Sequence, residues 1–112
     1  MSFFSKKPNV PTLPEIYAEL HKHKDIILVD VRTSDEYARE HAEGAQSIPL
    51  STITKETANL LKKFKKVYVI CQTGGRSTNA VRALQSLEVP AVNIPGGIES
   101  WKEHKLPIAH RH

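Results

Sequence analysis

The sequence has 112 residues and a single cysteine, and this scarcity limits how the chain can be stabilised. One cysteine cannot form an internal disulfide, so nothing in the composition indicates an oxidising compartment, and we expect a cytoplasmic protein. No apolar run approaches the roughly 20 residues that a membrane-spanning helix requires. The segment from Met1 to Pro8 has no long apolar core and does not resemble a secretory signal. We therefore expect no disulfide and no membrane partner.

The composition is otherwise that of one globular domain, with 39% hydrophobic and 25% charged residues. We expect a loose arm over residues 1–10, a domain over 11–109 and a short tail over 110–112. The formal net charge is +4, and lysines cluster between Lys62 and Lys66. No aromatic residues alternate with these lysines, so we interpret them as the solvated end of a helix and expect no nucleic-acid partner.

Capping signals and apolar runs alternate along the chain. Thr12 with Glu15, and Thr33 with Glu36, have the spacing of capping boxes and predict helix starts. Continuous apolar runs such as Ile26–Val29 are typical of strands covered on both faces. We expect strands at 26–29, 46–49, 67–70 and within 89–94, and helices at 12–24, 33–39, 51–64, 78–87 and after 97. This alternation predicts an α/β fold with a parallel sheet and helices on both faces.

The segment from Cys71 to Ser77, here called the Cys71 loop, contains the chain's only thiol. It reads Cys71-Gln72-Thr73-Gly74-Gly75-Arg76-Ser77 and lies between a predicted strand and a predicted helix that begins near its end. Gly74 and Gly75 lack a Cβ, so we expect both to take backbone angles that turn N–H groups toward one point. The helix start and Arg76 add positive charge. This pattern favours an anion at the Cys71 sulfur and indicates a nucleophile rather than an inert buried cysteine.

Asp30-Val31-Arg32 follows the first predicted strand, at the sheet edge where ligands bind in open α/β folds. The carboxylate and the guanidinium could orient the Cys71 loop. Alternatively, Arg32 could form a structural ion pair with Asp30 or Glu36. His41 lies in a predicted turn over residues 40–45, and we interpret it as a hydrogen-bonded turn residue rather than a base.

Several spaced motifs resemble the rhodanese-like sulfurtransferases in their single-domain form, from about Leu13 to Pro107. They are Leu28-Val29-Asp30-Val31-Arg32 with Glu36-Tyr37, His41 with Gly44-Ala45 and Ile48-Pro49, the Cys71 loop, and Pro95-Gly96-Gly97-Ile98 with Trp101. The resemblance implies a three-layer α/β fold with a parallel five-stranded sheet. It also implies transfer of a sulfane sulfur through a persulfide on Cys71, without metal or cofactor.

In such a reaction Cys71 would take sulfur from a small anionic donor such as thiosulfate and pass it to cyanide or a thiol. A thioredoxin-like or other sulfur-relay protein could carry the acceptor thiol. The resemblance implies that residues 72–76 surround the sulfur, that Arg76 attracts the donor, with Arg32 as a second candidate, and that Ser77, Asp30 and Arg32 support the loop. Gly96-Gly97 and Trp101 would form one wall, with core packing as the alternative for Trp101.

Two other functions compete with this one. Cysteine phosphatases place five residues between cysteine and arginine, whereas four separate Cys71 from Arg76, and a tighter ring suits one added sulfur atom. A non-enzymatic persulfide carrier or protein-interaction module would be the other alternative. A carrier would keep the same loop, so the sequence leaves this alternative open.

Overall fold

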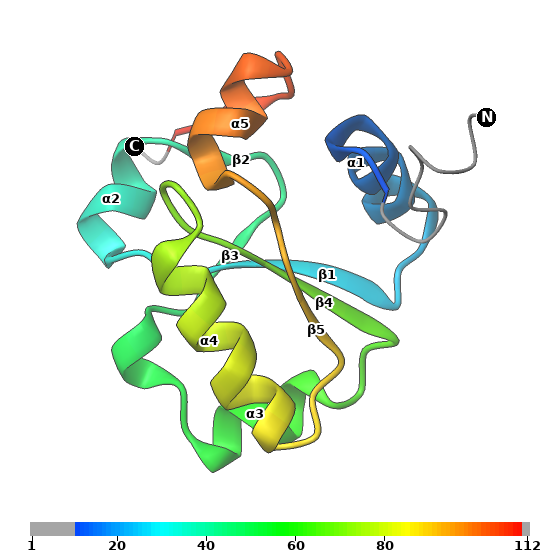
Figure 1. Ribbon diagram of the computed structural model, residues 1–112, viewed down its shortest axis with the longest axis vertical. Coiled ribbons are helices and arrows are strands. Elements are labelled where there is room, and N and C mark those ends of the chain that lie inside the picture. The colour runs from blue at the N-terminus through cyan, green and yellow to red at the C-terminus, as the bar shows by residue number, and fades with distance from the viewer. Residues whose placement is uncertain (1–10, 111–112) are drawn as a thin grey trace, which may run out of the picture.

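Four parallel strands form the central sheet of this protein, whose computed structural model describes residues 11–110 (Figure 1). Their order is β3-β1-β4-β5, and they span Gln46–Ser47, Ile26–Asp30, Lys66–Ile70 and Ala91–Asn93. The parallel α/β prediction is confirmed, but the count of five strands is wrong for the described residues. The predicted arm, 1–10, and residues 111–112 of the predicted tail lie outside them.

Two further strands pair with each other rather than with the central sheet. β2 (His41–Ala42) runs antiparallel to β6 (Ile108–Ala109). The predicted turn at 40–45 is therefore wrong in its first half, because His41 and Ala42 form ladder contacts and only the following residues turn. Ala91–Asn93 is likewise not the last strand, since a C-terminal segment without a strong apolar run supplies β6.

Helices cover both faces of the sheet, as predicted (Figure 1). α1 (Leu13–Lys22) and α5 (Gly97–Glu103) lie on one face, and α3 (Lys55–Leu61) and α4 (Gly75–Ser86) on the other. α2 (Ser34–Arg39) follows β1. No helix within residues 11–110 is long and apolar enough to cross a membrane.

Local capping chemistry explains where the helices begin. Both predicted capping boxes are present, with Thr12 and Glu15 at α1 and Thr33 and Glu36 at α2. The single helix predicted over 51–64 is wrong, because η2, a 3₁₀ turn at Leu50–Thr52, ends before Thr54 caps α3. Thr54 Oγ1 accepts a hydrogen bond from the Thr57 N–H at 3.3 Å, which starts a new helix there.

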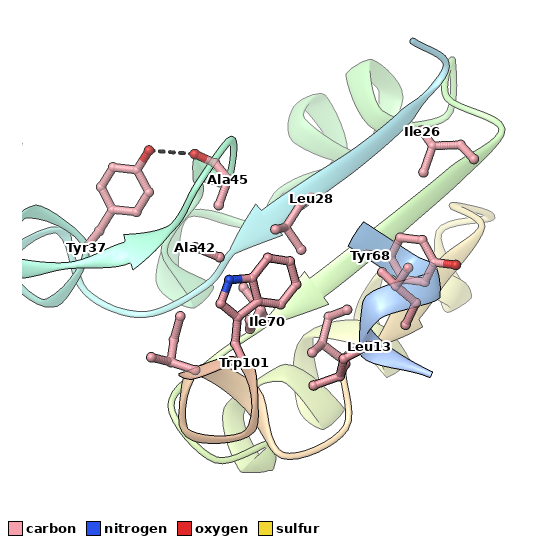
Figure 2. Packing of buried hydrophobic residues seen from close by; sticks show 12 residues of the cluster. Leu13, Ile26, Leu28, Tyr37, Ala42, Ala45, Tyr68, Ile70 and Trp101 are labelled. Atoms are coloured by element: carbon pink, nitrogen blue, oxygen red, sulfur yellow. Dashed lines mark hydrogen bonds between the residues drawn. The ribbon is translucent and has the colours of Figure 1, made fainter. Parts of the chain in front are cut away.

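The core on the α1 and α5 face is built around Trp101, which is fully buried. Figure 2 shows its indole beside Leu28 of β1 and Ile70 of β4. The indole Nε1–H donates to the Pro107 carbonyl at 2.9 Å, so the ring's polar atom is satisfied. Trp101 is therefore a core residue rather than a wall of the Cys71 site.

Candidate active site

Asp, Asn and Cys side chains lie at or just after the carboxyl ends of three central strands, at one edge of the sheet. Asp30 ends β1, Asn93 ends β5, and Cys71 directly follows β4. Because these strands are parallel, their carboxyl ends meet at the edge where α/β proteins bind ligands. The fold thus brings together residues from three strands that are far apart in sequence.

Hydrogen-bond donors surround the Cys71 sulfur. The Gly74 N–H donates to Sγ at 3.0 Å, and the thiol lies 3.2 Å from the Ser77 hydroxyl oxygen. Burial raises the pKa of the Cys71 thiol, but hydrogen bonding with the Ser77 hydroxyl and with the N–H groups of Ser77, Gly74 and Thr73 outweighs it. The pKa of Cys71 therefore lies below its ordinary value, which favours the nucleophilic thiolate.

The two loop glycines have different roles. Gly74 has φ +115°, a left-handed conformation that favours glycine, and it caps α4. Gly75 has no positive φ and is the first residue of that helix, so of the two glycines only Gly74 takes a left-handed conformation. The helix begins three residues earlier than the predicted 78, and Arg76 and Ser77 consequently lie in its first turn.

Ser77 connects the sulfur to a residue that the sequence did not single out. Ser77 is fully buried, and its hydroxyl is within hydrogen-bond distance of the Gly74 carbonyl and of Asn93 Oδ1. Asn93 fixes the hydroxyl that faces Sγ. A polar residue closing the last strand of a parallel sheet was the available signal for it, as it was for Asp30.

α5 packs directly against the back of the Cys71 loop. The Ile98 N–H donates to the Cys71 carbonyl at 2.8 Å, and the Glu99 N–H donates to the Gln72 carbonyl at 3.2 Å. A Cβ on Gly97, which has φ +61°, would lie 2.3 Å from the Cys71 carbonyl oxygen. Only glycine permits this close approach, so the Gly96-Gly97 turn does border the loop.

Asp30 and Arg32 form a buried ion pair beside the loop. Arg32 Nη2 lies 2.8 Å from Asp30 Oδ2, and the two side chains are 3% and 0% exposed. The guanidinium also donates to Gln72 Oε1 at 3.1 Å and to the Glu40 carbonyl at 2.7 Å. Arg32 thus forms the ion pair with Asp30 that was one of the two interpretations, and it also contacts Gln72 of the Cys71 loop.

Arg76 is paired with Glu36 on the outer side of the loop. Its Nη1 and Nη2 donate to the two Glu36 carboxylate oxygens at 2.7 and 3.0 Å. Hydrogen bonding from Arg76 is the largest cause that lowers the pKa of Glu36 to about 2. Glu36 was predicted as a capping residue and as a possible partner of Arg32, and its bond to Arg76 was missed because it joins residues 40 apart in sequence.

An open hollow of about 360 Å³ adjoins the loop, here called the Glu36 hollow. It is lined by Gln72, two arginines and two glutamates, namely Arg32, Arg39, Glu36 and Glu40. Gln72 Nε2 also donates to Glu99, which holds the side chain at the rim of the loop. A small polar molecule beside the loop would meet charged groups of both signs.

His41 is held by its own contacts with Tyr37. It is buried, stacks on Tyr37 with ring centroids 3.8 Å apart, and its Nδ1 is 2.7 Å from the Tyr37 carbonyl. A hydrogen-bonded structural histidine was predicted, and it occupies a strand instead of a turn. Within residues 11–110 no three His, Cys, Asp or Glu side chains are grouped to hold a metal ion.

Comparison with known proteins agrees with this architecture. The Rhodanese-like domain family matches residues 12–104. Coxiella burnetii GlpE, named a thiosulfate sulfurtransferase, is 33% identical over 77% of this chain and 80% of its own length. The "Putative sulfur carrier protein YrkF" of Bacillus subtilis is 33% identical, over 83% of this chain and 53% of its own length.

A solved structure gives the same result for the fold. The crystal structure of the BH2092 protein from Bacillus halodurans has a TM-score of 0.81 and 27% identity, covering 96% of this chain and 82% of that one. The chain spans only 58% and 53% of the first two curated relatives it matches. Since the family match covers nearly the whole chain and includes the Cys71 loop, this protein belongs to the rhodanese-like domain family.

Proposed function

We propose that this chain is a sulfurtransferase that carries a sulfane sulfur as a persulfide on Cys71. The observation that supports this most directly is the set of donors around the Cys71 sulfur, with the Gly74 N–H at 3.0 Å. These donors stabilise negative charge on Sγ and on a sulfur atom bound to it. The relatives named as sulfurtransferase and sulfur carrier support the same chemistry.

The first half-reaction starts from the Cys71 thiolate and thiosulfate. Sγ attacks the outer sulfur, and the new S–S bond forms as the S–S bond of thiosulfate breaks. The bonding pair leaves with sulfite, and Cys71 becomes a persulfide anion. Charge is conserved, because a thiolate and a dianion give a persulfide anion and a dianion. The sulfur remains inside the ring of N–H groups, as covalent catalysis requires.

The second half-reaction returns the enzyme to its starting state. An acceptor thiolate attacks the terminal sulfur and leaves with it as a persulfide, while the electron pair returns to Cys71 Sγ. Cyanide attacks in the same way and gives thiocyanate. A thioredoxin-like or other sulfur-relay protein could supply the thiol. The need for a reduced thiol also supports a cytoplasmic location.

A persulfide carrier is the second candidate, supported by the name of the Bacillus subtilis relative. A carrier would load sulfur on Cys71 by the same first step and release it only to a partner protein. A phosphatase is less well supported, since Arg76 is bound to Glu36 in a bidentate pair instead of facing a phosphate alone.

Intact-mass analysis after mixing with thiosulfate tests the proposal. We expect the wild type to gain the mass of a sulfur atom and Cys71→Ser to gain nothing. No gain in the wild type, or equal gain in both proteins, would overturn it. Sulfur uptake with release to neither cyanide nor small thiols would favour the carrier, and turnover of an aryl phosphate without sulfur uptake would favour the phosphatase.

A further inference from the structure

We infer that Glu36 determines donor specificity at the Cys71 site, because it cancels the charge of the loop arginine and so disfavours doubly charged sulfur donors relative to singly charged ones. This inference rests on the proposed sulfur transfer. It names a residue of α2, outside the Cys71 loop, that acts on the donor through its charge and its contact with Arg76.

The first observation is that the only cation of the Cys71 loop is already neutralised. Arg76 makes two hydrogen bonds to Glu36, at 2.7 and 3.0 Å, so both carboxylate oxygens face the guanidinium. A bidentate pair of this kind presents almost no net charge to a third group. A donor dianion that approaches Cys71 must therefore compete with Glu36 for Arg76.

The second observation is the charge balance of the Glu36 hollow beside the loop. Arg32 and Arg39 supply positive charge and Glu36 and Glu40 supply negative charge, so the formal charges of its lining cancel. Arg32 is further bound to buried Asp30, and Glu40 to Lys102 at 2.7 Å. Removing the Glu36 charge would leave one more unit of positive charge beside the Cys71 loop, which favours a dianion over a monoanion.

The third observation is that Glu36 can lose its charge without losing its place. Its Oε1 accepts hydrogen bonds from the Thr33 N–H at 3.0 Å and the Thr33 hydroxyl at 3.1 Å, in the capping box of α2. Glutamine serves in the same position of a capping box, and its amide oxygen can still accept from Thr33 and Arg76. Glu36→Gln therefore removes a negative charge and keeps the capping box of α2, while the amide Nε2 that replaces Oε2 gives up the hydrogen bond from Arg76 Nη2.

The test compares two donors that differ by one unit of charge, thiosulfate and methanethiosulfonate. Both deliver a sulfane sulfur to Cys71, and methanethiosulfonate releases methanesulfinate in place of sulfite. For Glu36→Gln we expect kcat/KM for thiosulfate to rise about threefold to tenfold, because one nearby charge is removed. For methanethiosulfonate the rise should be about the square root of that factor, since its charge is half as large.

Glu19→Gln is the matched control. Glu19 is also a partly exposed carboxylate in an ion pair, with Lys66, and its side chain is 27% exposed against 23% for Glu36. It lies at the opposite end of the sheet, where β4 begins. The substitution changes the net charge of the protein equally, so we expect it to leave the ratio of the two kcat/KM values unchanged.

The outcomes separate this inference from the proposed function. If Glu36→Gln keeps the thermal unfolding profile and still forms the Cys71 persulfide, but the thiosulfate to methanethiosulfonate ratio stays constant or falls, the inference is wrong and sulfur transfer stands. An equal rise in the ratio for Glu19→Gln would also overturn it. As a second readout, raising salt should slow wild-type thiosulfate turnover only slightly and slow that of the Glu36→Gln variant more steeply.

Discussion

Two arginine–carboxylate pairs contact the Cys71 loop, and they differ in how deeply they are buried. Asp30 and Arg32 lie on its buried side, with side chains 0% and 3% exposed. Glu36 and Arg76 lie on its open side, with side chains 23% and 39% exposed. The buried pair makes further hydrogen bonds to protein groups, and each pair contributes one residue, Arg32 or Glu36, to the lining of the Glu36 hollow.

This difference separates two functions of the same kind of contact. A buried charge must be matched by its partner, so the Asp30–Arg32 pair fixes the position of the loop and has little freedom to vary. A partly exposed pair contributes little to stability, so its charge can instead be adapted to the ligand. The buried side should therefore govern folding, and the open side should govern the choice of donor.

The largest expected effect comes from breaking the buried pair. Asp30→Asn leaves Arg32 as a buried charge with only neutral acceptors, and we expect a loss of about 3–5 kcal/mol in the free energy of unfolding. Urea denaturation measures it. Asp25→Asn, at an exposed aspartate just before β1, is the control and should change stability by less than about 0.5 kcal/mol. A loss for Asp30→Asn far below the expected range of about 3–5 kcal/mol would mean that the pair does not stabilise the fold.

Two glycines give a second contrast: Gly97 of α5, which packs against the Cys71 loop, and Gly75, which is exposed in the loop itself. Gly97→Ala on the buried side combines a left-handed residue with a Cβ that would lie 2.3 Å from the Cys71 carbonyl oxygen. We expect it to cost at least about 1–3 kcal/mol and to lower sulfur uptake. Gly75→Ala on the open side has no heavy atom within 4 Å of its new Cβ and should be neutral or stabilising. Equal losses in both variants would contradict this reading of the loop.

A smaller effect is expected at the sulfur itself. Ser77→Ala removes the hydroxyl that helps to lower the pKa of Cys71, so that pKa should rise. The reactive thiolate forms as pH rises through this pKa, and the variant should therefore need a higher pH. Ultraviolet absorbance of the thiolate against pH measures the shift. Ser86→Ala, near the exposed end of α4, is the control, and a similar shift there would refute the assignment to Ser77.

The smallest effect on stability should come from the open pair. Glu36→Gln should change the free energy of unfolding by less than about 1 kcal/mol at neutral pH. The pKa of Glu36 is about 2 when folded against an ordinary 4.5, so its contribution is complete above pH 4.5 and is lost as pH falls toward 2. The stability difference between wild type and variant should shrink over that interval. A difference that grows on acidification would show that another group dominates.

Much of this architecture follows from local sequence signals. The capping boxes at Thr12 and Thr33 and the buried strands at 26–29 and 67–70 depend on neighbouring residues, and each appears within about a residue of its predicted position. The Cys71 loop is equally local, because the strand, the glycines and the helix start are contiguous. These features could be predicted because no distant contact decides them.

Several errors arose where distant residues decide the structure. His41–Ala42 is a strand because Ile108–Ala109, far along the chain, pairs with it. Arg76 faces a carboxylate because α2 brings Glu36 beside α4, and no residue spacing in the sequence predicts that contact. Asn93 and Gly97 meet the loop for the same reason. The contacts that join the Cys71 loop to distant elements are thus the part that the sequence could not predict.

The most direct test of sulfur transfer at Cys71 is the sulfite released when the protein meets excess thiosulfate with no acceptor present. We predict a single burst of about one sulfite per chain, because one thiolate takes one sulfur and then stops. Cys71→Ser should release none. Absence of the burst in the folded wild type, or an equal burst from Cys71→Ser, would contradict a persulfide on Cys71.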